Sequence, residues 1–291
     1  MSRRTAPAAL ASGLSVMLVA VAVAAAPGDA SVPPCAPVAA QVSAAEAESL
    51  RAAAVQAASA ACPPGTRLRR SRQGSHRVRQ CLRRRDRVPH GPMERRDRHG
   101  HLVEAGVLRE GLREGPWLHR FSFSADLGSY RGGQKHGRWL TRLDDGVWQS
   151  VEHHDGALHG ELRKYTAAGA CTELQRHKSG RPHGVWAGTW PGGGPRLHGG
   201  HDDSGHRHGL WRTWHEDGSL AEERHYRYGR AHGPFRSAWP GGGVAEEGRF
   251  DDGERSDEWR VYDLEGAVIW RARYAAGQPP ETEDLGAAAG P

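Results

Sequence analysis

The sequence predicts an all-β fold, an elongated antiparallel array of β-hairpin repeats that follows a short helical or disordered N-terminal lead-in. The 291 residues include 39 glycines and are only 37% hydrophobic, which leaves too few bulky side chains for a thick layered core. Glycine, histidine and aromatic residues recur about every 24 residues from 89 to 279, which gives eight repeats. Each repeat contains two short strand-forming stretches separated by glycine-containing turns, the pattern of a β-hairpin.

Residues 1–30 have the pattern of a secretory signal peptide. Arg3 and Arg4 precede an apolar run over residues 8–26, and small residues follow as far as Ala30. We expect cleavage near Ala30 and therefore an exported protein that is periplasmic, envelope-associated or secreted. The alternative is an uncleaved N-terminal anchor, although the run is short for a bilayer span of about 20 residues.

Residues 31–62 form an Ala-rich segment that is predicted to be a helical or disordered linker. Ser43 and Glu46 resemble a capping box, which indicates a helix over residues 44–61. Because this helix carries only two bulky apolar side chains, it has little surface to bury. We expect it to be a spacer or a weakly docked lead-in, with partial disorder as the alternative.

Residues 63–88 form an Arg-rich lead-in that one predicted disulfide closes into a loop. Cys62 and Cys81 enclose a short segment just before the repeats, and an exported protein meets an oxidising environment. Closing such a loop would add about 3 kcal/mol of stability through loop-closure entropy. Cys35 and Cys171 would remain as a second pair, and free thiols are the alternative.

The positive charge of the chain is concentrated in and just after this lead-in. Residues 63–100 carry 13 Arg against three acidic residues, a balance of +10, whereas residues 101–291 have a balance of −4. An anionic membrane or polysaccharide surface would therefore contact the lead-in, where Arg can form bidentate contacts with phosphate. The candidate anion-binding residues are Arg69, Arg70, Arg83, Arg84 and Arg85.

A solvated segment without a ligand is the alternative, because 37 Arg against three Lys indicate a general bias toward arginine in this chain. Nucleic acid is disfavoured as a partner by export and by the absence of aromatic residues among these arginines.

The repeats are aligned on a His-Gly pair, whose glycine we call the marker glycine. The pairs, interpreted as structural turn residues, are His90 and Gly91, His136 and Gly137, His159 and Gly160, His183 and Gly184, His208 and Gly209, and His232 and Gly233. The repeated aromatic positions are Trp117, Trp139, Trp186, Trp211, Trp214, Phe235 and Trp259. Glycine is needed where the backbone turns with positive φ, and the aromatic side chains supply most of the apolar surface.

The histidine column is interpreted as a source of turn-stabilising hydrogen bonds, and no metal or other cofactor is expected. Two strands of about 4.8 Å spacing separate successive histidines, which is too far for several of them to share a zinc ion. The better local candidates for metal ligands are His206 with His208, or His153, His154 and Asp155. No hydrolase, metalloprotease or phosphate-loop motif occurs, so the sequence indicates a protein that is not an enzyme.

The repeats resemble MORN repeats, in the bacterial variant found in exported proteins and in a group labelled antitoxin components. The resemblance rests on the segments at 133–139, 205–218 and 229–235 and covers about two thirds of the chain. Three repeats depart from the pattern: Asp257 replaces a marker glycine, Leu162 replaces the tryptophan, and the repeat at Gly115 is shortened and lacks both its histidine and its turn glycine. The resemblance implies a hairpin array and attachment to a protein or a membrane surface, not a defined activity.

Two functions are expected from these features. The leading one is a non-catalytic exported scaffold that binds another envelope protein or an anionic envelope surface, with exposed Trp and Tyr as anchors. The alternative, suggested by the family label alone, is an antitoxin or immunity-type protein that neutralises a partner toxin. Residues 280–291 are expected to be a disordered tail.

Overall fold

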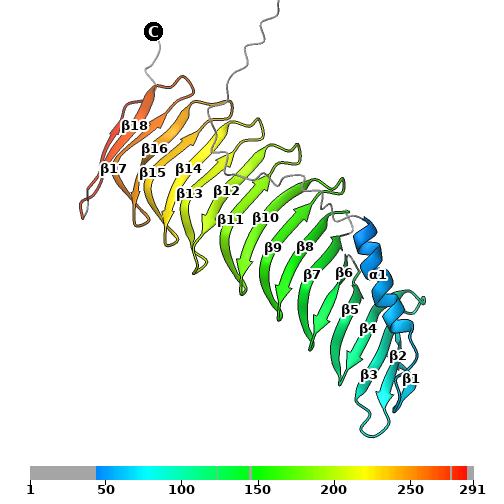
Figure 1. The fold of residues 1–291 in the computed structure, drawn as a ribbon. Coiled ribbons are helices and arrows are strands. Elements are labelled where there is room, and N and C mark those ends of the chain that lie inside the picture. Colours follow the sequence, from blue (N-terminus) through cyan, green and yellow to red (C-terminus); the bar gives the residue numbers. More distant parts are fainter. Residues whose placement is uncertain (1–43, 123, 144–145, 276, 287–291) are drawn as a thin grey trace, which may run out of the picture. The chain divides into compact units, whose positions relative to one another are not determined.

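A computed structural model describes residues 44–122, 124–143, 146–275 and 277–286, which all belong to one compact unit, residues 34–291. The predicted signal peptide lies outside the described residues. The described chain has one helix, α1 (Ala44–Ser59), followed by strands that each pair antiparallel with the next one in chain order (Figure 1). The result is a single open sheet of 19 strands, so the predicted all-β antiparallel hairpin fold is confirmed.

The strands fall into the lead-in hairpin, the eight repeat hairpins and a short last strand. They are β1 (Thr66–Gln73), β2 (His76–Arg83), β3 (Pro89–Arg96), β4 (Leu102–Arg109), β5 (Leu112–Arg120), β6 (Ser124–Arg131), β7 (Gln134–Leu143), β8 (Trp148–His154), β9 (Ala157–Tyr165), β10 (Cys171–Lys178), β11 (Arg181–Thr189), β12 (Pro195–His201), β13 (Arg207–Trp214), β14 (Leu220–Arg227), β15 (Arg230–Ala238), β16 (Val244–Asp251), β17 (Glu254–Tyr262), β18 (Val268–Tyr274) and β19 (Glu281–Asp284).

Each marker glycine lies in a β-bulge. In β7, His136 and Leu140 pair with Ser129 and Leu127 of β6, so three residues of β7 lie opposite Gly128 alone. A bulge of this kind needs a backbone with positive φ, and φ is 70° at Gly137. Asp257, which replaces the marker glycine in the last repeat, adopts the same conformation with φ of 59°. Asp adopts a positive φ more readily than most residues, so the bulge is kept although aspartate replaces the glycine.

The Arg-rich lead-in is part of the sheet. We expected a disulfide loop before the repeats, but β1 and β2 form a hairpin, and β2 pairs with the first repeat strand, β3. The physical reason lies in β2, whose side chains Val78, Cys81 and Leu82 are buried at the start of the array. An isolated hairpin is marginal in water, and pairing with β3 gives this one a partner.

Helix α1 covers one face of the first repeats, over β3 to β6 (Figure 1). Its small side chains Ala47, Ala54 and Ala58 are buried against Leu118 and Leu140 of the sheet. We expected a weakly docked spacer, but alanine on this face lets the helix backbone approach the leucines closely. We call this face of the sheet, which also contains Ala105 and Leu127, the helix face.

The opposite face of the sheet carries the repeated tryptophans, and we call it the tryptophan face. Successive residues of a strand point to opposite faces, so Trp117 and Trp139 lie on the other side from their neighbours Leu118 and Leu140. Trp117, Trp139 and Tyr130 form a second buried cluster there, with Met93 and Leu108 packed beside them.

The C-terminal segment does not match the expected disordered tail. Residues Glu281–Asp284 form β19, which pairs with β18 through partners such as Arg271 and Glu283. The side-chain ion pair between these two residues, at 2.5 Å, accompanies the added strand. Among the residues described, no helix is long and apolar enough to cross a bilayer.

Candidate functional site

The repeated tryptophans are clamped inside the tryptophan face by glycines that the sequence analysis did not single out. In four repeats the bulge at the marker places the tryptophan over a glycine of the preceding strand, as at Gly106 for Trp117 and Gly128 for Trp139. A Cβ atom at either glycine would overlap the indole ring. The Trp139 Nε1 donates a hydrogen bond of 3.0 Å to the carbonyl of Ser129, the residue after the glycine. The available signal was a glycine 11 residues before each of these tryptophans.

A cation covers the exposed side of each clamped ring. Lys135 Nζ lies 4.1 Å from the centre of the Trp139 ring, and the same position four residues before the tryptophan supplies a cation in other repeats. The four clamps combine Gly106, Trp117 and Arg113; Gly128, Trp139 and Lys135; Gly199, Trp211 and Arg207; and Gly248, Trp259 and Arg255. Trp117, Trp139 and Trp259 are each only 1% exposed, so these residues hold the fold and are not the exposed anchors that we expected.

The remaining repeated aromatic residues occupy less regular surroundings. Trp186 is half-buried and stands over no glycine of the preceding strand, because Gln175 is its partner there. Phe235 is buried and pairs with Arg224, whose guanidinium lies 4.7 Å from the ring centre. Trp214 ends β13, and its carbonyl accepts a hydrogen bond from Trp190 Nε1. The clamp is therefore absent where the preceding strand lacks the glycine.

The histidine column connects the turn of one repeat to the turn of the next. The Nδ1 atoms of His90 and His159 accept hydrogen bonds from the backbone amides of Glu110 and Ser179. The other contacts are His136 with Asp155 at 3.6 Å, His183 with Asp203 at 3.2 Å, His232 with Asp251 at 3.0 Å, and the ring of His208 with the ring of Tyr228 at 5.9 Å. The expected turn hydrogen bond is present in two repeats, and in three others the histidine lies near a carboxylate but its Nδ1 makes no hydrogen bond.

The local metal-ligand candidates are separated by the strand geometry. His153 points to the tryptophan face, where its ring lies 6.5 Å from Trp139 and burial lowers its pKa, whereas His154 meets His136 and Asp155 at the turn. His206 contacts Asp202 at 3.6 Å, and His208 contacts the next turn. The structure thus replaces His153 by His136 in the predicted His153, His154 and Asp155 group, because residues adjacent in a strand face opposite sides.

A buried carboxylate lies on the tryptophan face beside the first clamp. Glu104 is 3% exposed and lies 2.6 Å from Arg95, 2.8 Å from Arg113 and 3.3 Å from His119. Burial by itself raises the pKa of Glu104, but the hydrogen bond from His119 and the charges of Arg95 and His119 outweigh it and lower the pKa to about 2. His119 also contacts the Tyr130 hydroxyl at 3.1 Å. Every charge in this cluster has a partner, which indicates a structural role.

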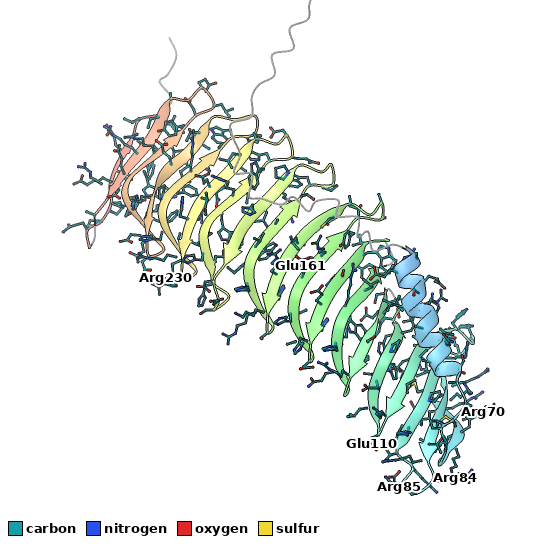
Figure 2. All side chains as sticks on the ribbon, viewed as in Figure 1. Arg70, Arg84, Arg85, Glu110, Glu161 and Arg230 are labelled. Atoms are coloured by element: carbon teal, nitrogen blue, oxygen red, sulfur yellow. A yellow bond between two sulfur atoms is a disulfide. The ribbon has the colours of Figure 1, made fainter. Side chains whose placement is uncertain are left out.

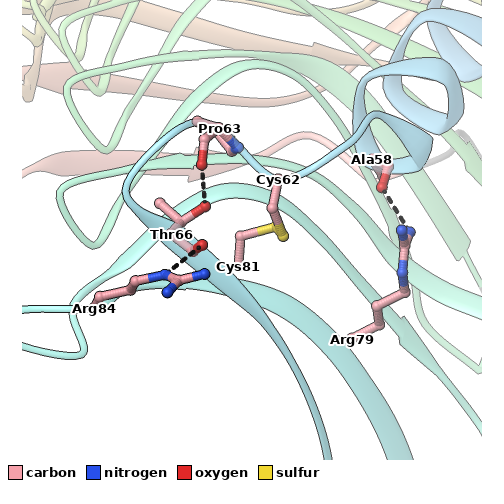
Figure 3. The surroundings of a disulfide bond; sticks show 7 residues. All are labelled: Ala58, Cys62, Pro63, Thr66, Arg79, Cys81 and Arg84. Atoms are coloured by element: carbon pink, nitrogen blue, oxygen red, sulfur yellow. Dashed lines mark hydrogen bonds between the residues drawn. A yellow bond between two sulfur atoms is a disulfide. The ribbon is translucent and has the colours of Figure 1, made fainter.

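The predicted disulfide between Cys62 and Cys81 is confirmed, with the two Cα atoms 5.6 Å apart (Figure 3). It ties Cys62, three residues after the end of α1, to the buried strand β2. The Arg79 guanidinium donates a hydrogen bond of 3.3 Å to the carbonyl of Ala58, at the C-terminal end of α1. Cys171 is not a free thiol, and Cys35 lies outside the described residues.

The five candidate anion-binding arginines do not form one site. Arg83 is engaged by Asp86 at 3.0 Å and by Glu110 at 3.0 Å, and Arg85 lies 3.4 Å from Asp86. Figure 2 labels Arg84 and Arg85 together near the turn that follows β2, with Arg70 apart from them. Arg84 donates to the Thr66 carbonyl at 3.5 Å, and Arg69 and Arg70, as neighbours in β1, face opposite sides of the sheet. Acidic partners thus neutralise part of the predicted set.

Arginines from three neighbouring strands do gather on the helix face at this end of the sheet. Arg70 pairs across the strands with Arg79, and Arg72 pairs with Arg77, which in turn pairs with Arg96. We call Arg70, Arg72, Arg77, Arg79 and Arg96 the arginine patch.

One carboxylate lies among these residues in the strand register. Glu94, the partner of Arg79 in β3, contacts Arg96 at 3.4 Å. Arg70, Arg72 and Arg77 are exposed, and within the described part of the chain they make no hydrogen bond or ion pair. Sequence reasoning included only Arg70 of this patch, because the cross-strand register was not known.

No family model matches this chain, and no curated protein matches it. Among solved structures, the crystal structure of a porin-like protein from Bacteroides uniformis ATCC 8492 matches over 74% of this chain and 91% of that chain, with 8% sequence identity and a TM-score of 0.17. A likeness of that size supports no argument about fold or function. The resemblance to MORN repeats therefore stays a prediction from the sequence.

Proposed function

We propose that this protein is a non-catalytic exported scaffold that attaches to an anionic membrane surface through the arginine patch. The observation that supports the proposal is the pairing of like charges on adjacent strands, Arg70 with Arg79 and the row Arg72, Arg77 and Arg96. Like charges directly opposite each other destabilise a sheet. Phosphate groups of a lipid surface would relieve this repulsion and accept bidentate hydrogen bonds from the guanidinium groups.

At the other end of the same face, arginines lie opposite glutamates. There, arginine and glutamate alternate across the strands in the row Arg212, Glu223, Arg236, Glu247 and Arg260. Arg212 Nε lies 2.8 Å from Glu223, and Arg260 lies 3.5 Å from Glu247. The row continues through Arg271, which lies opposite Arg260 on one side and Glu283 on the other, so each of its arginines lies beside a glutamate in the strand register. Arg70, Arg72 and Arg77 of the patch lie beside arginines only, and the patch therefore departs from this pattern.

Export supports the same function. The N-terminal sequence pattern predicts secretion, and a disulfide such as Cys62–Cys81 is typical of proteins outside the reducing cytosol. The disulfide and the bond from Arg79 to Ala58 also fix the patch against α1, so binding would not have to order a loose segment.

Sedimentation of the full chain with lipid vesicles tests this function. We expect binding to phosphatidylglycerol vesicles and much weaker binding to phosphatidylcholine vesicles. The triple variant Arg70→Gln, Arg72→Gln and Arg77→Gln should weaken binding by about 100-fold, since each basic residue near an anionic surface contributes about 1 kcal/mol.

The matched control removes three exposed arginines outside the patch, Arg181, Arg227 and Arg273, and changes the net charge equally. It should leave binding within about threefold of the parent protein. Equal losses in the two triple variants would show a general charge effect and contradict attachment through the patch, as would equal binding to the two vesicle types.

A further inference from the structure

One turn of the repeat array differs from the others because it brings two histidines and an aspartate together. The column histidine contacts an acidic residue of the following turn in three repeats, but only at His136 does a second histidine, His154, join the contact. The residue two positions before the turn glycine, which is His154 here, is Arg131 in the preceding repeat and Lys178 in the following one. Asp203 and Asp251 take this position in two later repeats, so among the described repeats only this turn places a histidine there.

The three donor groups are already near the spacing that a metal ion requires. His136 Nδ1 lies 3.6 Å from one oxygen of Asp155, and His154 Nδ1 lies 3.4 Å from the other. Donors bound tetrahedrally to Zn²⁺ at 2.0 to 2.2 Å lie about 3.4 Å from one another. One ligand atom from each residue lies within 4.8 Å of the others, and this is the only such group of three among the residues that the structure describes.

The contacts and exposure of these groups suit a metal ion. One carboxylate oxygen of Asp155 accepts a hydrogen bond of 2.8 Å from Arg131, and the other lies 3.4 Å from His154 Nδ1. His154 and Asp155 are more than half exposed, which leaves room for small rotations and for water ligands. The ring of His159, from the next strand, lies 5.7 Å from that of His154 and can approach the same ion.

We propose that His136, His154 and Asp155 form a site for a divalent transition-metal ion of the zinc type, with water in the remaining position. Imidazole nitrogens and a carboxylate oxygen are a ligand set typical of zinc sites with an open position. The site joins β7 to the turn between β8 and β9. Bound metal would therefore cross-link β7 to the turn that leads into the next repeat, at the edge of the sheet.

Isothermal titration of the untagged full chain with ZnCl₂ tests the site. We expect one saturable site, whose affinity falls at least tenfold in His154→Gln and in Asp155→Asn. Asn is chosen because Asp155 has a φ of 47°, a conformation that asparagine also tolerates. Circular dichroism melting in the presence of a chelator should be unchanged in both variants, which separates loss of a ligand from loss of the fold.

The chain offers a matched control variant and a variant that should bind zinc more tightly. His183→Gln removes a column histidine that contacts only Asp203, and it should leave zinc affinity unchanged. Arg131→Gln removes the guanidinium that occupies Asp155 at 2.8 Å, and it should strengthen zinc binding. Equal losses in His183→Gln and His154→Gln, or no loss in either ligand variant, would overturn the proposal.

Discussion

At the scale of single residues, the fold depends on the contact between a tryptophan and a glycine of the preceding strand. The spacing of Trp117 and Trp139 could be predicted from the sequence, because aromatic residues recur at a fixed distance from the marker. Their partners Gly106 and Gly128 were not identified. The sequence does not give the position of the bulge, and the bulge decides which glycine lies beneath each ring. The same bulge explains why these tryptophans are buried and not available as surface anchors.

Replacing the glycine beneath a tryptophan should destabilise the repeat. In Gly128→Ala the new methyl group would overlap the Trp139 ring, so we expect a loss of about 1 to 3 kcal/mol in the free energy of unfolding, measured by urea denaturation. Gly192→Ala is the control, because its added Cβ meets no atom within 4 Å and its φ is not positive. A similar loss in both variants would contradict the clamp.

The buried carboxylate of Glu104 should make stability depend on acid pH. Its pKa is about 2 in the folded protein and 4.5 ordinarily, so the folded state favours the ionised form. This contribution of about 3 kcal/mol is complete above pH 4.5 and is lost as the pH falls through about 2. The difference in unfolding free energy between the parent protein and Glu104→Gln should therefore shrink by about that amount from pH 5 to pH 2. A constant difference over this range would show that the Glu104 pKa is not depressed.

At the scale of secondary-structure elements, the lead-in shows what sequence reasoning could and could not supply. The helix after Ser43 and the pairing of Cys62 with Cys81 were predicted, because capping signals and cysteine spacing are local. The pairing of β2 with β3 was not predicted, because Val78 and Leu82 lie in an arginine-rich segment whose composition is typical of exposed chain. Cys81 lies opposite the bulge at Gly91, the place that a glycine takes in the clamped repeats.

Removing the disulfide should loosen only the first elements. In the Cys62→Ser and Cys81→Ser double variant, α1 and β1 should lose protection from hydrogen exchange by about 3 kcal/mol, the loop-closure contribution of a segment spanning 19 residues. Each strand pairs only with its neighbours in the chain, so β13 to β17 should exchange as before. Loss of protection throughout the sheet would show that the array unfolds as one cooperative unit.

At the scale of the whole described unit, the hairpin array gives the chain two faces and places one charge pattern at each end of the helix face. The fold class followed from periodicity alone. The arginine patch did not, because moving the β1–β2 register by one residue would put Arg69 in place of Arg70 on the helix face. The candidate site therefore depends on cross-strand pairing, which a single sequence does not reveal.

Attachment of the protein to membranes through the arginine patch can be tested by hydrogen exchange of the full chain bound to phosphatidylglycerol vesicles, compared with the free protein. Attachment through the arginine patch predicts that added protection is confined to residues 66–96, in β1 to β3, and to the adjoining helix α1. Protection at β13 to β17, where arginine and glutamate alternate, with none at β1 and β2, would contradict it.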